Sequence, residues 1–216
     1  MLESLVLESQ LPADSAVICL HGLGAAPQDV APIAKFLSPG LPNTRFIFPA
    51  APYRRVTANG GYEMRAWYDI LRFEPQRELN HQHIEQISQT VRELIVQQRK
   101  QGIDKVVLAG FSQGGAIAYQ TALSHPELLA GLVVMSSYVP SELSRFDSSK
   151  PLPTLIQHGS LDDVVAPALA DHAKQHLEAL GLQPELELYP ISHTIGHQQI
   201  KSLERWLEAT LGSPSI

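Results

Sequence analysis

The sequence has little cysteine, an excess of negative charge and no long hydrophobic run. Its one cysteine, Cys19, cannot form an internal disulfide, which excludes a disulfide-stapled fold and favours a reducing compartment. Lysine and arginine number 16 against 22 aspartates and glutamates, and the net charge of −6 repels phosphate backbones, so nucleic acid is not an expected partner. No stretch approaches the roughly 18 apolar residues of a membrane span, and Glu3 lies where a secretory signal carries basic residues. We therefore expect a cytoplasmic protein without an integral membrane segment.

What the chain does have is the length and composition of one folded domain. Its 216 residues are 44 % hydrophobic and 18 % charged, with no internal repeat or flexible linker, so we expect a single domain over residues 1–216. Short apolar runs predict strands at residues 2–7, 15–20, 44–49, 105–110, 130–136, 153–158 and 185–190. Stretches with helical spacing predict helices at residues 28–37, 80–101, 113–124, 166–180 and 197–211. This alternation predicts an α/β fold with a mostly parallel sheet covered on both faces.

Residues 50–79 interrupt the alternation and are expected to form a loop insertion over the scaffold. Prolines, glycines and an asparagine there, including Pro52 and Pro75, argue against regular elements. The insertion also carries five of the fourteen aromatic residues, namely Tyr53, Tyr62, Trp67, Tyr68 and Phe73. Such a segment either has a small core of its own or forms the wall of an apolar site, and the two interpretations are compatible.

The most informative motif is G-x-S-x-G at residues 110–114. An apolar strand precedes it and a helix rich in alanine and glycine follows it, which is the context of a nucleophile elbow. In so tight a turn the side chains that flank the serine would collide, so glycine is required at Gly110 and Gly114. The turn would lift the Ser112 hydroxyl above the carboxyl edge of the sheet, near a helix N-terminus that favours negative charge. We therefore predict Ser112 as a nucleophile.

A second motif, His-Gly-Leu-Gly at residues 21–24, follows an earlier strand and is typical of an oxyanion loop. A tetrahedral intermediate carries a full negative charge, and two preorganised N–H donors stabilise it best. We assign these donors to the backbone N–H groups of Leu23 and Gln113. His21 is predicted to be a buried residue that is hydrogen-bonded within the loop. A dinucleotide site is disfavoured because the third glycine and the acidic ribose partner are absent.

The serine needs a base, and imidazole, with an ordinary pKa near 6.5, is suited to that role at neutral pH. In a nucleophile-elbow fold the chain order is serine, acid, histidine. After Ser112, Asp162 and Asp163 follow one strand and His193 follows the next. We predict His193 as the base and Asp162 as the carboxylate that orients it, with Asp163 as the rival. His158, inside the preceding strand, is predicted to be structural.

Nine histidines raise the question of a metal site. The histidine pairs with suggestive spacing are 81 and 83, 172 and 176, and 193 and 197. The last pair lacks the glutamate of H-E-x-x-H, and none has a third acidic or cysteine ligand at a usual spacing. We therefore predict no metal.

Five segments together carry a resemblance to a known family: HGLG, GFSQGG, HGSLDDVV, YPISH and, in the insertion, MRAWYDI. Over nearly its whole length the chain resembles small bacterial carboxylesterases of the phospholipase/carboxylesterase family, related to acyl-protein thioesterases and lysophospholipases. The resemblance implies an α/β-hydrolase fold without a large cap, and a serine hydrolase that needs no cofactor. Matched residue by residue, it implies Ser112, Asp162 and His193 as the triad, favours Asp162 over Asp163, and implies Leu23 and Gln113 as oxyanion donors.

The function predicted on both grounds is cleavage of carboxylic esters with short to medium acyl chains through an acyl-enzyme. Trp67, Tyr68 and Leu71, with Leu23, are the predicted wall of the acyl site. Alternatives are an acyl-protein thioesterase, a lysophospholipase, a peptidase and, in another class, a catalytically silent binding module of the same fold. The expected partners are small-molecule or lipid esters and, as a further candidate, acylated proteins, bound by a monomer or homodimer.

Overall fold

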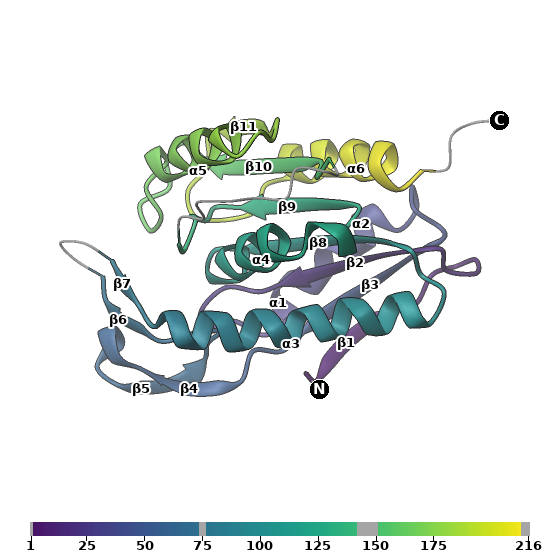
Figure 1. The fold of residues 1–216 in the computed structure, drawn as a ribbon. Helices are drawn as coiled ribbons and strands as arrows, with labels where there is room; N and C mark the ends of the chain where they lie inside the picture. Colours follow the sequence, from purple (N-terminus) through teal and green to yellow (C-terminus); the bar gives the residue numbers. More distant parts are fainter. Residues whose placement is uncertain (1, 74–76, 142–150, 213–216) are drawn as a thin grey trace.

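Seven strands form the central sheet of the computed structural model, which describes residues 2–73, 77–141 and 151–212 (Figure 1). In spatial order they are β1 (Ser4–Leu7), β3 (Thr44–Pro49), β2 (Ser15–Leu20), β8 (Lys105–Phe111), β9 (Gly131–Met135), β10 (Thr154–Gly159) and β11 (Glu185–Tyr189). Only the pairing of β1 with β3 is antiparallel within this sheet. The seven predicted strands and the mostly parallel sheet are confirmed.

Helices cover both faces of the sheet, as predicted. The helices and single turns are α1 (Pro27–Val30), η1 (Ala31–Ile33), α2 (Ala34–Leu37), α3 (His81–Lys100), α4 (Gln113–Ser124), η3 (Pro126–Leu128), α5 (Ala168–Ala179) and α6 (His197–Leu211). Side chains of α3, α4 and α5 pack on one face, and those of α1, α2 and α6 pack on the other. Alternate strand residues divide between the two cores, so Ile18 contributes to the first and Cys19 to the second. Burial raises the pKa of the Cys19 thiol to about 12, which fits the predicted small core residue.

The prediction of one continuous helix over residues 28–37 is wrong. The chain forms α1, one 3₁₀ turn and α2 there, because Pro32 has no N–H to continue an α-helical ladder.

The long α3 fits its prediction closely. Asn80 caps it by accepting a hydrogen bond from the His83 N–H at 3.1 Å.

The insertion is more regular than predicted. Its strands are β4 (Tyr53–Val56), β5 (Tyr62–Arg65), β6 (Ile70–Arg72) and β7 (Glu78–Leu79), joined in two antiparallel pairs, with the turn η2 (Thr57–Asn59). Asp69 ties the two pairs together, because its carboxylate accepts from the Thr57 N–H and hydroxyl, each at 2.7 Å. The break predicted at Pro75 lies outside the described residues. Figure 1 shows the insertion at the lower left of the view, beside the N-terminal end of α3.

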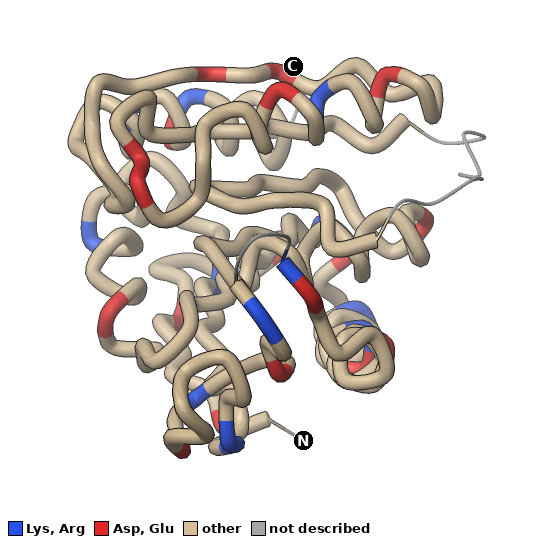
Figure 2. The backbone as a smooth tube through the Cα atoms, turned by 90° about the vertical axis from the view of Figure 1, so that its left-hand side faces the viewer, with Lys and Arg blue, Asp and Glu red and all other residues tan. Residues whose placement is uncertain are grey.

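Charges are interspersed over the molecule. Lysine and arginine (blue) and aspartate and glutamate (red) are mixed over the view in Figure 2. Among the described residues, no helix is both long enough and apolar enough to cross a bilayer.

Candidate active site

Ser112 lies at a strained turn between β8 and α4. Its backbone has φ 53° and ψ −120°, in a region that residues with a side chain seldom adopt. A Cβ added at Gly110 would lie 2.4 Å from the Gly114 carbonyl oxygen, and one added at Gly114 would lie 2.3 Å from that of Leu20. Both glycines are therefore required sterically, and the turn has the geometry of a nucleophile elbow.

Three strand-top loops bring Ser112, His193 and Asp162 into one hydrogen-bonded chain. His193 Nε2 lies 3.0 Å from Ser112 Oγ, and His193 Nδ1 lies 2.7 Å from Asp162 Oδ2. Because a carboxylate can only accept, Nδ1 carries the proton and Nε2 is left to accept from the serine hydroxyl. The adjacent Asp163 is exposed and takes no part in this chain. The ring of Phe111 supports His193, with centroids 4.7 Å apart.

Asp162 is held as a buried, ionised carboxylate. Burial by itself raises its pKa, but hydrogen bonds from the Val165 N–H at 2.8 Å, from His193 and from the Val164 N–H at 3.0 Å outweigh burial. The net result is a pKa below the ordinary value for aspartate. His158, also buried, bonds the Val165 carbonyl through Nε2 at 2.8 Å and braces the same loop.

The backbone N–H groups predicted as oxyanion donors lie at the same cavity as Ser112. Leu23 and Gln113 both line it, and Gln113 is the first residue of α4. Within the described chain, neither N–H donates to another protein group. Both donors remain available to a ligand oxygen.

Hydrogen bonds join the insertion to both segments that carry the predicted oxyanion donors. The Gln113 side chain accepts from the Trp67 N–H at 2.8 Å and donates to the Tyr68 carbonyl at 2.8 Å. The Trp67 indole donates to the His21 carbonyl at 2.7 Å, and the Gly24 N–H donates to the Arg65 carbonyl at 2.8 Å. No local sequence pattern predicts these long-range contacts.

His21 completes the attachment, as a buried residue without a direct part in the serine chain. Its Nδ1–H donates to the Gly22 carbonyl at 2.8 Å, and its Nε2 accepts from the Ala51 N–H at 3.0 Å. Burial lowers the pKa of this imidazole. The predicted hydrogen bonding within the loop is thus present, and one bond reaches the insertion as well.

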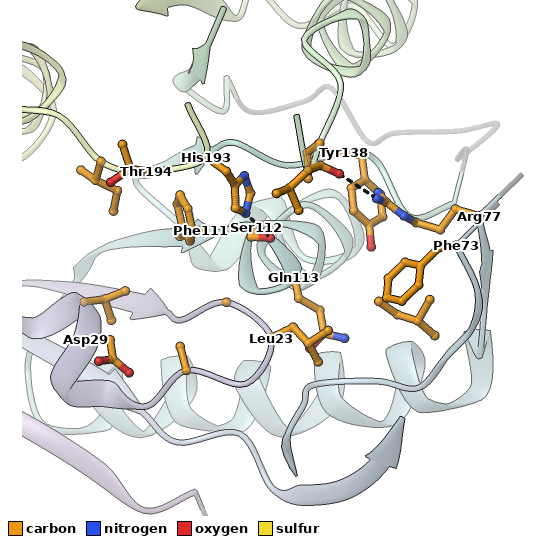
Figure 3. A pocket seen from close by; sticks show the side chains of 17 residues that line it. Leu23, Asp29, Phe73, Arg77, Phe111, Ser112, Gln113, Tyr138, His193 and Thr194 are labelled. Atoms are coloured by element: carbon orange, nitrogen blue, oxygen red, sulfur yellow. Dashed lines mark hydrogen bonds between the residues drawn. The ribbon is translucent and has the colours of Figure 1, made fainter. Parts of the chain in front are cut away.

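The cavity around Ser112 has a volume of about 500 Å³. Figure 3 shows Leu23 below Ser112, Phe73 and Arg77 at one end, and Asp29 at the other. The wall also includes Ile70, Phe73, Tyr138, Val164, Val165 and Ile195. Of these, Phe73 is one of the insertion aromatics counted from the sequence, the two valines and Ile195 lie near the predicted acid and base, and Ile70 and Tyr138 were not predicted to line the site.

The structure does not bring the three predicted insertion residues to this wall. Trp67 and Tyr68 are fully buried in the core, and Leu71, although partly exposed, lies outside the cavity lining. Side chains alternate along β6, so Ile70 faces inward where Leu71 turns away. The insertion therefore buries its apolar side chains in the core that it shares with α3 and α4, and it contributes Ile70 and Phe73 to the wall.

Over residues 2–73, 77–141 and 151–212, no three metal-ligating side chains of histidine, cysteine, aspartate or glutamate come together. His193 makes its two hydrogen bonds to Asp162 and Ser112. This is the order of carboxylate, imidazole and hydroxyl in which a histidine can activate a serine as a nucleophile. Such a chain, beside two unused N–H donors, is suited to acyl transfer.

Comparison with known proteins points the same way. The family model described as phospholipase/carboxylesterase matches residues 2–211. Carboxylesterase SOBER1 from Arabidopsis thaliana is 32 % identical, over 94 % of this chain and 93 % of that protein. Acyl-protein thioesterase 1 from Saccharomyces cerevisiae is 30 % identical, over 94 % of this chain and 95 % of the relative. The crystal structure of SOBER1 superposes with a TM-score of 0.85 and 30 % identity, covering 91 % of this chain and 99 % of the other. The predicted α/β-hydrolase fold is confirmed.

Proposed function

Because the chain belongs to the phospholipase/carboxylesterase family and is a carboxylic ester hydrolase, we propose that it cleaves short to medium acyl esters through an acyl-enzyme on Ser112. His193 acts as the base and Asp162 orients it. The backbone N–H groups of Leu23 and Gln113 stabilise the oxyanion. The observation that carries this proposal is the continuous chain Ser112–His193–Asp162, with contacts of 3.0 and 2.7 Å.

The reaction proceeds in two halves. Ser112 Oγ attacks the ester carbonyl carbon while its proton passes to His193 Nε2, and the carbonyl oxygen becomes an oxyanion. The acyl–oxygen bond then breaks, and the departing alkoxide takes that proton. In the second half, water gives a proton to His193 and attacks the acyl-enzyme, and the acid leaves as Ser112 regains its hydrogen. Every proton that moves in these steps passes through His193 and Ser112 regains its hydrogen, so the steps as written need no cofactor.

The direct test combines turnover with covalent labelling. Hydrolysis of p-nitrophenyl butyrate and labelling by a fluorophosphonate are both expected in the wild type, and both should be lost in Ser112→Ala. Ser160→Ala is the matched control, because this exposed serine should leave both signals intact. Labelling that persists in Ser112→Ala would show that another residue is the nucleophile.

A second candidate is thioester cleavage on acylated proteins, favoured by the yeast relative that is named an acyl-protein thioesterase. A thioester presents the same carbonyl to the same oxyanion donors, so one site can serve both bonds. The values of kcat/KM on an S-acylated peptide, a lysophospholipid and a simple ester of the same acyl chain would rank the three activities.

A further inference from the structure

One cation lines the active-site cavity at the end away from Asp29. Arg77 contributes to the lining near Phe73 and Tyr138 (Figure 3), and its side chain is half-buried. Within the described residues, no carboxylate forms an ion pair with it. By contrast, Arg72 on β6 pairs with Glu78 at 3.0 Å, outside the lining. An arginine without a carboxylate partner inside a substrate cavity is available to a ligand anion.

The donors of Arg77 are poorly used by the protein itself. One Nη2–H donates to the Val164 carbonyl at 3.4 Å, longer than an ordinary N–H···O bond. The buried Nε has no partner among the described residues. The guanidinium carbon lies 4.3 Å from the centroid of the Tyr138 ring, within cation–π distance. Tyr138 and the Val164 carbonyl thus hold the group at the cavity, and its Nε is left without a partner among the described residues.

An ester has two arms, the acyl group and the leaving alcohol, and the position of Arg77 relative to His193 indicates which of them it meets. In the tetrahedral intermediate the leaving oxygen lies beside His193 Nε2, because this nitrogen delivers its proton, so the acyl group extends away from His193. In Figure 3, His193 lies above Ser112, whereas Phe73 and Arg77 lie to its right, at the end of the cavity opposite Asp29. Apolar side chains of Ile70, Phe73 and Val164 line the cavity as well. The acyl arm therefore meets apolar wall and a cation.

We propose that Arg77 is an anion-binding residue for the acyl arm, so that preferred substrates are esters whose acyl chain ends in a carboxylate. The inference rests on the proposed function, since it presupposes an acyl group on Ser112. The apolar wall takes the methylene groups and the guanidinium takes the terminal carboxylate by charge-assisted hydrogen bonds. A second cavity of about 580 Å³ also has Arg77 and Tyr138 in its lining.

The test compares mono-p-nitrophenyl adipate with its methyl ester, which has the same chain and no charge. We expect kcat/KM to be about 10-fold to 100-fold higher for the carboxylate, the range of a charge-assisted hydrogen bond. Arg77→Met should abolish this ratio, Arg77→Lys should retain part of it, and Arg72→Met should leave it unchanged. Raising the salt concentration should reduce the ratio in the wild type only modestly, because the site is half-buried.

Three results would overturn the proposal. One is a wild type that hydrolyses both adipates at equal kcat/KM. Another is an Arg77→Met variant that loses activity on both to the same extent, which would make the residue a support of the wall. The third is an effect of Arg77→Met on 4-carboxyphenyl hexanoate relative to phenyl hexanoate, with none on the adipates, which would place the anion on the leaving arm. Failure of the proposed function is distinguishable, because then the wild type would neither hydrolyse p-nitrophenyl butyrate nor react with the fluorophosphonate.

Discussion

The strand-top loops and the insertion contribute to the cavity in different ways. The loops fix Ser112 and Asp162 mainly through their own backbones, by a strained turn in one case and by two N–H bonds in the other. The insertion is held in place by side chains that reach across the chain, from Trp67 to the His21 carbonyl and from Gln113 to the Trp67 N–H and the Tyr68 carbonyl. Reacting atoms are positioned by local geometry, while the surroundings that select a substrate are positioned by long-range contacts.

This difference predicts the largest loss of activity at the strand-top loops. Asp162→Asn should lower kcat roughly 1,000-fold to 10,000-fold, because an amide can no longer hold His193 in the productive tautomer. Asp163→Asn is the matched control, since this exposed carboxylate makes no contact with His193, and it should change kcat by less than about 3-fold. Steady-state hydrolysis of p-nitrophenyl butyrate measures both. The reverse ranking would mean that the loop rearranges and that the neighbouring carboxylate is the functional one.

Backbone fit at the elbow should give the next largest effect. Gly114→Ala places a Cβ 2.3 Å from the Leu20 carbonyl oxygen and 2.5 Å from that of His21, so β2 and α4 must separate. We expect a loss of about 3 kcal/mol in the free energy of unfolding, the upper range for overpacking, with a fall in kcat because the oxyanion loop moves. Gly181→Ala is strained by a φ of +87° but has open space, so it should cost only about 1 kcal/mol and spare activity. Urea unfolding measures the free energy of unfolding of both variants. An equal loss in Gly114→Ala and Gly181→Ala would show that close packing at the elbow adds nothing to the cost.

The same contrast explains what could be predicted from the sequence. G-x-S-x-G and the strand ends before Asp162 and His193 are local patterns whose geometry follows from sterics and from the topology of a parallel sheet. The side chain of Gln113 carries no such local signal, because its partners at Trp67 and Tyr68 lie more than forty residues away in the chain.

Two of the errors, in the wall residues and in the short strands, fall on the insertion for the same reason. A high density of aromatic residues indicated a wall, but density does not say which way a side chain points. Trp67 is amphipathic and finds a buried acceptor at the His21 carbonyl, so it is drawn into the core. Two short antiparallel pairs were also missed, since strands of two to four residues leave no periodic pattern.

An intermediate effect is expected where the two regions are joined. Trp67→Phe removes the indole donor and leaves the His21 carbonyl unpaired in the core, at a cost of about 1–3 kcal/mol. Because that carbonyl belongs to the oxyanion loop, we expect kcat to fall about 10-fold with KM nearly unchanged. Tyr68→Phe removes a buried bond of 2.6 Å to the Tyr138 hydroxyl, so it should lower stability comparably and leave kcat within about 2-fold. Equal kcat in both variants would show that the indole bond only stabilises the fold.

A smaller effect should separate two neighbours within the insertion. Phe73 lines the cavity and Leu71 does not, although both are partly exposed. Phe73→Ala should lower kcat/KM about 3-fold to 10-fold for hexanoyl and octanoyl esters relative to acetyl, since it removes apolar contact with the longer chains. The profile of Leu71→Ala should match that of the wild type. A shifted profile in Leu71→Ala would restore the original assignment of the wall.

The smallest expected effect is a pH dependence at the contact of His21 with Ala51. Neutral His21 both donates, to Gly22, and accepts, from the Ala51 N–H, and protonation would turn its Nε2 into a second donor that faces that N–H. Burial also lowers the pKa of this imidazole below 6.5 in the folded protein, so the unfolded chain takes up the proton first as the pH falls. The contribution of His21 to the free energy of unfolding is therefore fully present above the unfolded pKa. It declines on acidification by about 1.4 kcal/mol for each pH unit between the two pKa values.

Titration of the His21 ring by NMR should give a midpoint below 6.5, with the Ala51 amide signal broadening as the proton binds. A midpoint above 6.5 would mean that the histidine opens to solvent, and that the insertion is attached to the oxyanion loop mainly through Trp67.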